Sequence, residues 1–566
     1  MKHRFTRLFC GLFLVALGTL LYEIALIRVL SFTIWYHFAY TVISTALLGF
    51  GASGSLLAVR PSIGSVDLPR SLGRASLLAA VTGAAFLGMM SLFPFDPMKI
   101  VESRRDLLIM LAYEVGATVP FFFSGLAVSL TLRAGATRVD RLYFWDLAGA
   151  GLGCAVSVAL MNALTPPGAV LFACAILAAS AVAFRGKSLV ATSLTGAFAL
   201  SACFAEHIPL TPASSKSLSV HIELQKMVPV FSKWTALFRT DVVEKREAGP
   251  RLENGDEWGL SGQIEYRAQP AWGFLTHDGS AGAPIYDLGK GNLAFLDDHI
   301  LRLPYLVAGA HPRVLVIGVG GGRDVLTALR YEASHVTGVE LDPVTVGLLQ
   351  TTYAAQARGA FTRPDVDLVA GEGRHFVERS KDRYDVIQIT GVDTLAAQTS
   401  GAYVLAENYL YTTDAFQAYL DHLTPHGSLS IGSGDWNPSE PQGVGRMLLV
   451  ARQALRERGI ADPVRHIVAV SSLHLITEIL VRTEPFPAEE LDRIESDAKR
   501  LGFLPLVLGG REAHPLYGQL MQLEGPERKT LLDSLPYVID PVTDESPFFF
   551  RFFRWSDLPR QTNFGP

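Results

Sequence analysis

The stretch from residue 314 to residue 342, VLVIGVGGGRDVLTALRYEASHVTGVELD, holds the residues whose types and spacing most clearly suggest chemistry. Gly318, Gly320, Gly321 and Gly322 stand between an apolar run and an amphipathic one. Without a Cβ the backbone can turn sharply there and approach a ligand closely, and the start of the following helix offers free N–H groups. Glu340 ends the next apolar run, where a carboxylate can accept hydrogen bonds from ribose hydroxyls. Together these features predict a nucleoside-binding site.

A second acid follows the next apolar run. Glu372 lies in the small-residue turn VAGEGRHF, where folds of this kind usually contact the edge of an adenine ring. It is equally an acid that the N-terminal dipole of the following helix would favour. The two interpretations stay open at this point.

Short apolar strands alternate with helical stretches around these residues, which predicts a doubly wound, methyltransferase-like α/β sheet. We expect strands at 313–319, 336–342, 366–373, 384–390 and 427–434, and helices at 323–332, 343–356, 374–380 and 413–423. Two further strands, near 466–471 and 475–482, should form an antiparallel edge, with a helix at 487–502 beyond them.

A small β-rich segment is expected before this domain, because short alternating runs stand between glycine and proline residues. The predicted strands are 217–224, 241–247, 262–268, 272–279 and 291–298. The predicted domains are therefore 1–205, 206–300 and 301–566.

The first 205 residues predict a transmembrane helical bundle, because they contain apolar runs of about the 20 residues that cross a bilayer. Six or seven spans are expected, at 8–29, 34–59, 74–94, 107–131, 142–163, 168–184 and 188–205. Small-residue runs at 49–55 and 149–153 predict close helix packing. Lys and Arg residues flank alternate span ends, which places those ends in the cytoplasm. Seven spans would put the later domain outside the cell, away from a nucleoside made in the cytoplasm. We weigh the supply of that nucleoside above the span count and expect the later domain in the cytoplasm. The membrane is then the inner (plasma) membrane.

Three acids fall inside the predicted spans: Glu23, Glu114 and Asp146. An ionised group in hydrocarbon is costly, so such residues pair or line a polar path. One interpretation is a route for a cation. The other is that Glu23 pairs with a nearby base such as Arg28 and that Asp146 reaches water.

Composition narrows the range of partners. The formal net charge is −5 over 566 residues, so no nucleic acid is expected. All four cysteines lie at or before residue 203, which leaves no zinc site, disulfide framework or cysteine nucleophile in the later part, and no histidine spacing suggests a metal. The expected partners are the lipid bilayer and a small molecule, either an amine or a lipophilic substrate, and a homodimer is a candidate assembly.

Several segments carry a family resemblance. The glycine stretch, VTGVELDP, GEGR, YDVIQI and LYTTDAFQAYL resemble the spermidine synthase family of aminopropyltransferases. The resemblance is closer to relatives in which membrane spans precede a spermidine synthase-like domain, as the segments at 21–54 and 540–553 also suggest. Family members bind decarboxylated S-adenosylmethionine and transfer its aminopropyl group to an amine. The resemblance implies that Gly318, Gly320 and Gly322 line the methionine-derived tail, Glu340 the ribose and Glu372 the adenine.

The sequence departs from the family at the expected reaction centre. The family's Asp-x-x-Asp pattern after the fourth strand is here Thr390-Gly391-Val392-Asp393, so the first acid is missing. A neutral hydroxyl is no general base at neutral pH. Thr390 and Asp393 are the catalytic candidates, and Asp393 is equally a loop acid that caps the turn.

Three functions follow from these features. The first is a membrane-bound aminopropyltransferase using decarboxylated S-adenosylmethionine, for which positioning of the amine supplies much of the catalysis. The second is a methyltransferase using S-adenosylmethionine, whose extra carboxylate would need a partner such as Arg323. The third is a transporter or sensor that binds a polyamine or nucleoside without turnover.

Overall fold

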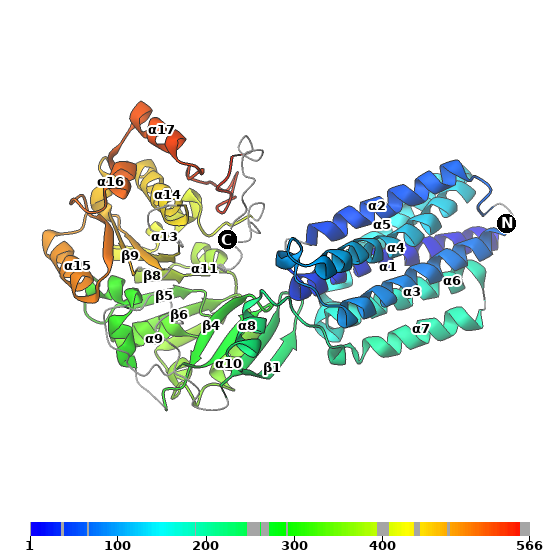
Figure 1. The fold of residues 1–566 in the computed structure, drawn as a ribbon, viewed down its shortest axis with the longest axis horizontal. Coiled ribbons are helices and arrows are strands. Elements are labelled where there is room, and N and C mark those ends of the chain that lie inside the picture. Colours follow the sequence, from blue (N-terminus) through cyan, green and yellow to red (C-terminus); the bar gives the residue numbers. More distant parts are fainter. Residues whose placement is uncertain are drawn as a thin grey trace. The chain divides into compact units, whose positions relative to one another are not determined.

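The computed structural model describes residues 2–35, 39–64, 67–186, 188–245, 261, 271–289, 293–392, 407–434, 442–472 and 476–554. The chain divides into two compact units (Figure 1). The helical unit contains Met1–Gln225, Phe231–Asp241 and His277–Gly279. The α/β unit contains Lys226–Val230, Val242–Thr276 and Ser280–Pro566.

Seven helices form most of the helical unit, and each corresponds to one predicted span. They are α1 (Lys2–Thr33), α2 (Ala39–Val59), α3 (Leu68–Leu92), α4 (Arg104–Ala134), α5 (Val139–Leu164), α6 (Pro166–Arg185) and α7 (Leu189–Ala202). The first six are long and apolar enough to cross a membrane, whereas α7 has only 14 residues. At 1.5 Å per residue α7 extends about 21 Å, less than the roughly 30 Å of a hydrocarbon core. The described residues therefore hold six candidate spans, the smaller of the two expected numbers.

Glycines bring these helices together. A Cβ on Gly149 of α5 would lie 2.3 Å from the carbonyl oxygen of Phe13 in α1, and a Cβ on Gly49 of α2 would lie 2.7 Å from the backbone nitrogen of Phe122 in α4. Real Cβ atoms do not approach so closely, so only glycine permits these backbone contacts. The predicted packing role of the small-residue runs is confirmed.

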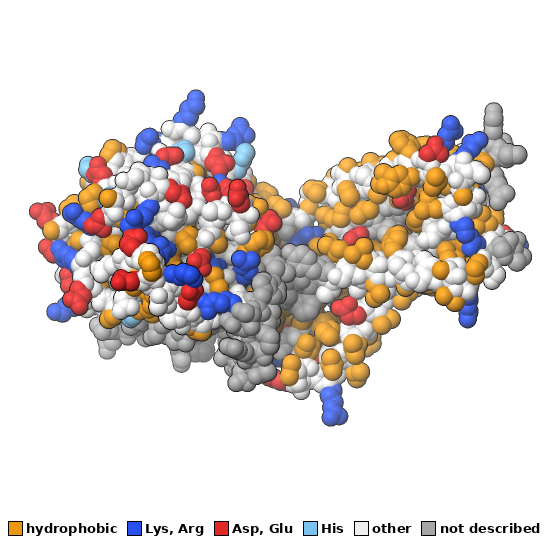
Figure 2. Space-filling model, turned by 90° about the horizontal axis from the view of Figure 1, so that it is seen from above, with side chains coloured by type: hydrophobic (Ala, Val, Ile, Leu, Met, Phe, Trp, Pro, Cys, Tyr) orange, Lys and Arg blue, Asp and Glu red, His pale blue; other side chains and the backbone are white. Residues whose placement is uncertain are grey.

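The surface of the helical unit is apolar. Hydrophobic side chains cover most of its visible face, whereas charged side chains are spread over the α/β unit (Figure 2). Leu108, Val115 and Val158 of α4 and α5 are 66%, 64% and 56% exposed. Such large exposed apolar side chains suit a lipid environment rather than water.

The predicted pairing of Glu23 with Arg28 is wrong. Arg28 donates two hydrogen bonds to Asp278, at 2.9 and 3.0 Å, and the two side chains form an ion pair. Asp278 is about 250 residues away in sequence, so no local pattern indicates this partner.

A four-stranded sheet has the order β1-β2-β3-β4, with β1 (Val228–Trp234), β2 (Arg239–Glu244), β3 (Ala271–His277) and β4 (Ala281–Tyr286). The strands predicted at 241–247 and 272–279 correspond to β2 and β3, whereas the one predicted at 262–268 lies outside the described residues.

Two predicted strands of this segment are wrong. Residues 217–224 form helix α8 (Ser217–Glu223), and residues 291–298 contain the 3₁₀ helix η5 (Leu293–Asp298). The consecutive residues Phe295 and Leu296 are both buried, so this segment lacks the alternating burial on which the strand prediction rested. Over so few residues an alternating pattern cannot be distinguished from a helical turn.

The α/β unit is built on an eight-stranded sheet in the order β12-β10-β11-β9-β8-β5-β6-β7. Strands β5 to β9 are parallel, and β9, β11, β10 and β12 pair antiparallel in that order. The strands are β5 (Arg313–Ile317), β6 (His335–Glu340), β7 (Val366–Ala370), β8 (Tyr384–Thr390), β9 (Leu423–Ser433), β10 (Ile467–Ser471), β11 (Thr477–Val481) and β12 (Leu504–Leu508). The predicted doubly wound sheet with an antiparallel side is confirmed, together with the bundle that precedes it.

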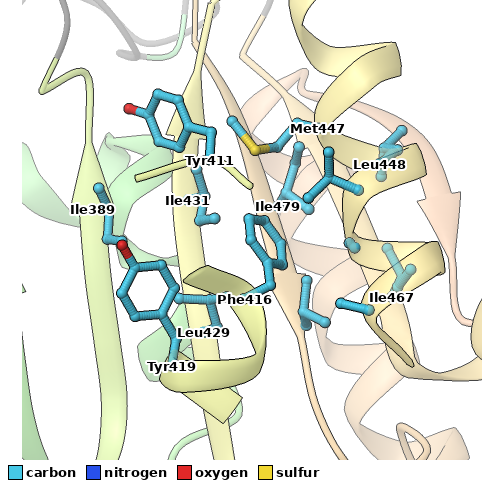
Figure 3. Packing of buried hydrophobic residues seen from close by; sticks show 14 of the residues in the cluster. Ile389, Tyr411, Phe416, Tyr419, Leu429, Ile431, Met447, Leu448, Ile467 and Ile479 are labelled. Carbon is cyan, nitrogen blue, oxygen red and sulfur yellow. The ribbon is translucent and has the colours of Figure 1, made fainter. Parts of the chain in front are cut away.

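Helices cover both faces of this sheet (Figure 1). They are α9 (Arg323–Arg330), α10 (Pro343–Gln350), α11 (Gly373–Arg379), α13 (Thr413–Asp421), α14 (Gly443–Glu457), α15 (Ala488–Leu501) and α16 (Pro515–Gln522). Helix α17 (Gly525–Ser534) follows and packs on α16. On one face, Ile389, Leu429, Ile431 and Ile479 of the strands pack against Phe416 and Tyr419 of α13 and Met447 and Leu448 of α14 (Figure 3). The opposite face receives α9 and the 3₁₀ helix η6 (Ile300–Leu306).

Candidate active site

The glycine turn connects β5 to α9. Gly318, Gly320 and Gly322 have positive φ angles of 81°, 51° and 94°, which a residue with a Cβ rarely adopts. Gly322 is the N-cap of α9, so the first backbone N–H groups of that helix lie directly after the turn. The predicted strand, turn and helix are thus all present.

Gly321 serves a different purpose. A Cβ there would lie 1.9 Å from the carbonyl oxygen of Pro284 in β4. Likewise, a Cβ on Gly322 would lie 2.1 Å from the ring of Phe361. These two glycines therefore let the turn pack tightly against its own domain, in addition to any room they leave for a ligand.

Glu340 holds the glycine turn to the end of β6. Its Oε2 accepts a hydrogen bond from the Gly320 N–H at 2.9 Å, and its Oε1 accepts one from the Asp342 N–H at 3.0 Å. The residue is 6% exposed. A carboxylate has about four lone-pair sites, so these two bonds leave capacity for two hydroxyl groups. The arrangement fits the predicted ribose contact.

Glu372 is the N-cap of α11. Its carboxylate accepts hydrogen bonds from the N–H groups of Arg374 and His375 at 3.0 and 2.7 Å. Of the two roles considered for Glu372, the structure shows the acid at the helix N-terminus. The adenine contact stays a prediction. Nearby, Arg374 forms a two-bond ion pair with Asp544 at 2.7 and 2.6 Å.

The two catalytic candidates differ in what can be said of them. Asp393 lies outside the described residues. Thr390 is the last residue of β8. Its side chain lies beside the Cβ position of Gly432, as the Glu478 side chain also does. Glu478 interacts electrostatically with Asp324 of α9, so Thr390 lies on the face of the sheet that α9 covers. Thr390 Oγ1 is buried, and the hydroxyl lies beside Asp324 of α9.

Around Thr390 the structure brings together a group of buried polar side chains that the sequence analysis missed. We call this group the polar layer. It consists of Tyr305, Asp324, Gln388, Thr390, Ser430 and Glu478.

Strand register explains how the polar layer forms. Gln388 of β8 lies opposite Ser430 of β9, and both Thr390 of β8 and Glu478 of β11 lie opposite Gly432 of β9. Ser430 donates a hydrogen bond to Glu478 Oε1, and Tyr305 of η6 donates one to Gln388 Oε1 at 2.8 Å. A lone charged residue in the apolar strand sequence ITEILV was the available signal for Glu478.

Burial controls the protonation of the two acids in the polar layer. It raises the pKa of Glu478 to about 8, with the Ser430 hydrogen bond opposing the shift and the negative charge of Asp324 adding to it. It raises the pKa of Asp324 to about 6, while Arg323 and the nearby Thr390 hydroxyl lower that pKa. Acids with such shifted pKa values in a ligand-binding fold are candidates for acid–base chemistry.

Comparisons with known proteins agree with this geometry. Residues 295–437 match the family model described as the spermine/spermidine synthase domain. The match includes the glycine turn, Glu340, Glu372 and Thr390. This part of the chain is therefore similar to the spermine/spermidine synthase domain, which confirms the resemblance seen in the sequence.

Two curated relatives are polyamine aminopropyltransferases. The one named polyamine aminopropyltransferase 2, from Hyperthermus butylicus, is 35% identical over 147 residues, which is 25% of this chain and 46% of that protein. The polyamine aminopropyltransferase of Nitrosomonas europaea is 30% identical over 138 residues, 24% of this chain and 40% of that protein. The chain thus spans less than half the length of these relatives. Among solved structures, spermidine synthase from Thermotoga maritima matches with a TM-score of 0.32 and 16% identity, over 54% of this chain and 87% of that one.

Proposed function

We propose that this protein is a membrane-bound aminopropyltransferase that takes decarboxylated S-adenosylmethionine and an amine as substrates. The observation that carries the proposal is the glycine turn held to Glu340, within the region that matches the spermidine synthase domain. The names of the curated relatives support the same reaction.

The residues of the turn divide the task of binding the nucleoside. As the family resemblance implies, the backbone at Gly318 and Gly320 lies along the sulfonium end, and the positive φ angles of both residues shape the turn there. Glu340 accepts hydrogen bonds from the ribose hydroxyls. When bound, the sulfonium nucleoside supplies a good leaving group: the amine nitrogen bonds to the propyl carbon, the C–S bond breaks, and its electron pair stays on sulfur as a neutral thioether.

We infer that the α/β unit acts on the cytoplasmic side of the membrane. With six spans and an N-terminus retained in the cytoplasm by Lys2, Arg4 and Arg7, the chain after α6 returns to the cytoplasm. The decarboxylated nucleoside is available in that compartment.

Product analysis of the purified full-length protein tests this function. The protein in detergent is given decarboxylated S-adenosylmethionine with linear diamines, or S-adenosylmethionine with the same amines, and the nucleosides are identified by mass spectrometry. We expect methylthioadenosine from the decarboxylated donor. S-adenosylhomocysteine from the other donor would instead indicate methyl transfer, and binding of either donor without any thioether would exclude both enzymes.

A further inference from the structure

The missing acid at Thr390 leaves the amine without the carboxylate that the family resemblance implies, and the polar layer contains one close by. Thr390 and Glu478 both lie opposite Gly432, on the two strands that flank β9. A Cβ on Gly432 would lie 2.7 Å from Thr390 Cγ2 and 3.0 Å from Glu478 Oε2. The Thr390 and Glu478 side chains therefore both lie over Gly432, on the same face of the sheet.

The polar layer adjoins the glycine turn. A Cβ on Gly318 would lie 2.2 Å from Cγ1 of Val392, two residues after Thr390. Asp324, in the first turn of α9, interacts electrostatically with both Tyr305 and Glu478. The carboxylate of Glu478 thus belongs to the same edge of the sheet as the predicted nucleoside site.

Two polar atoms of the layer are buried without a hydrogen-bond partner among the described residues: Gln388 Nε2 and Glu478 Oε2. Glu478 and Gln388 are both 0% exposed. Buried polar atoms are nearly always paired, so such a group in one place calls for a partner. An ammonium group, with several N–H donors and a positive charge, suits the Glu478 carboxylate oxygen, whereas Gln388 Nε2 is itself a donor and needs an acceptor.

Resting on the proposed function, we propose that Glu478 supplies the carboxylate that Thr390 lacks, binding the ammonium group of the acceptor amine and accepting its proton. This step uses the ionised form of Glu478, whose fraction grows as pH rises toward about 8: the proton passes from the amine nitrogen to Glu478 Oε2, and the nitrogen lone pair so released forms the new C–N bond. The alkylated product carries its positive charge on nitrogen, and Glu478 later returns its proton to solvent.

Calorimetry and kinetics on the full-length protein in detergent test the assignment. The probes are decarboxylated S-adenosylmethionine, 1,3-diaminopropane, putrescine and cadaverine. The variants are Glu478→Gln, the matched control Glu484→Gln, which makes the same change at an exposed residue, and the double variant Thr390→Asp/Glu478→Gln, which places an acid where the family has it.

We expect all three variants to bind the nucleoside as the wild type does. Glu478→Gln should bind the best diamine at least tenfold more weakly and lose at least 100-fold in kcat/KM, and the double variant should recover at least tenfold. Diamine affinity equal in Glu478→Gln and the control, or no diamine binding by the wild type, would overturn the assignment. So would an equal loss of nucleoside affinity in Glu478→Gln, because the layer would then be structural. Diamine binding that depends on Glu478 but yields no thioether would instead overturn the proposed function and leave the amine site standing.

Discussion

A single glutamate in a buried strand has a consequence that can be measured without any ligand. Glu478 is fully buried, and its pKa is raised from 4.5 to about 8. The folded protein therefore holds a proton that the unfolded chain releases, so the free energy of unfolding falls as pH rises from about 4.5 to about 8. Asp324 titrates near 6 within this window, and Arg323 is the neighbouring positive charge.

Replacing Glu478 by glutamine should remove its share of this pH dependence. Between pH 5 and pH 8 we expect the wild type to lose stability relative to Glu478→Gln by a few kcal/mol, because each unit of pKa shift is worth about 1.4 kcal/mol. Thermal unfolding of both proteins in the same detergent across this range measures the difference. Parallel curves for the two proteins would show that Glu478 ionises normally in the folded state.

The sequence predicts those site residues whose partners are near them in the chain, and it misses those whose partners are far away. Glu340 and the glycines could be predicted, because strand, turn, helix and acid follow one another within 29 residues. Glu478 could not, because it meets Thr390 only through the register of three strands, 88 positions apart in sequence. For Glu372 the local sequence fits both an adenine contact and a helix N-cap, and the structure shows the N-cap.

At the scale of elements, the contact between the glycine turn and β4 should set the stability of the α/β unit. Gly321→Ala places a Cβ 1.9 Å from the Pro284 carbonyl oxygen, so one of the two backbones has to move. We expect a loss of about 2–4 kcal/mol, typical of overpacking and backbone shifts. The measurement is the thermal unfolding of the full chain.

Gly347→Ala is the matched control for this change. Gly347 lies inside α10, and a Cβ there would meet nothing within 4 Å. Alanine should stabilise that helix by up to about 1 kcal/mol. If Gly321→Ala were as stable as Gly347→Ala, the turn would not pack against β4 as described.

The elements themselves were predicted unevenly, for a physical reason. Parallel strands buried on both faces give continuous apolar runs, so β5, β6 and β8 were expected at nearly their observed positions. Helix α8 and the 3₁₀ helix η5 were predicted as strands, because segments of seven and six residues hold too few positions to separate the two periods. Strands β1, β4 and β12 and helices α14, α16 and α17 were not predicted.

For the whole molecule, the six candidate spans define a topology that cysteine labelling can check. In a chain without its four native cysteines, a single cysteine is placed at Ala136, between α4 and α5, at Met98, between α3 and α4, or at Glu512 in the α/β unit; all three positions are exposed. With the N-terminus in the cytoplasm, only Met98→Cys should react with a membrane-impermeant maleimide in intact cells. The other two should react only after permeabilisation.

Labelling of Glu512→Cys in intact cells would place the α/β unit outside and contradict the topology. Such a result would also remove the cytoplasmic nucleoside as the expected substrate. The sequence left open whether there are six or seven spans, because the apolar run at 188–205 is near the minimum length for crossing a bilayer. The 14-residue length of α7 is what favours six.

The central claim is that a sulfonium nucleoside binds at the glycine turn with its ribose on Glu340. The most direct test is the affinity of the full-length protein for decarboxylated S-adenosylmethionine, measured by calorimetry for the wild type, Glu340→Gln and the control Asp367→Asn, an exposed acid on the neighbouring strand β7. We expect at least a tenfold loss of affinity for Glu340→Gln, about 1.4 kcal/mol, and no change for the control. Equal affinity in all three proteins would contradict the claim.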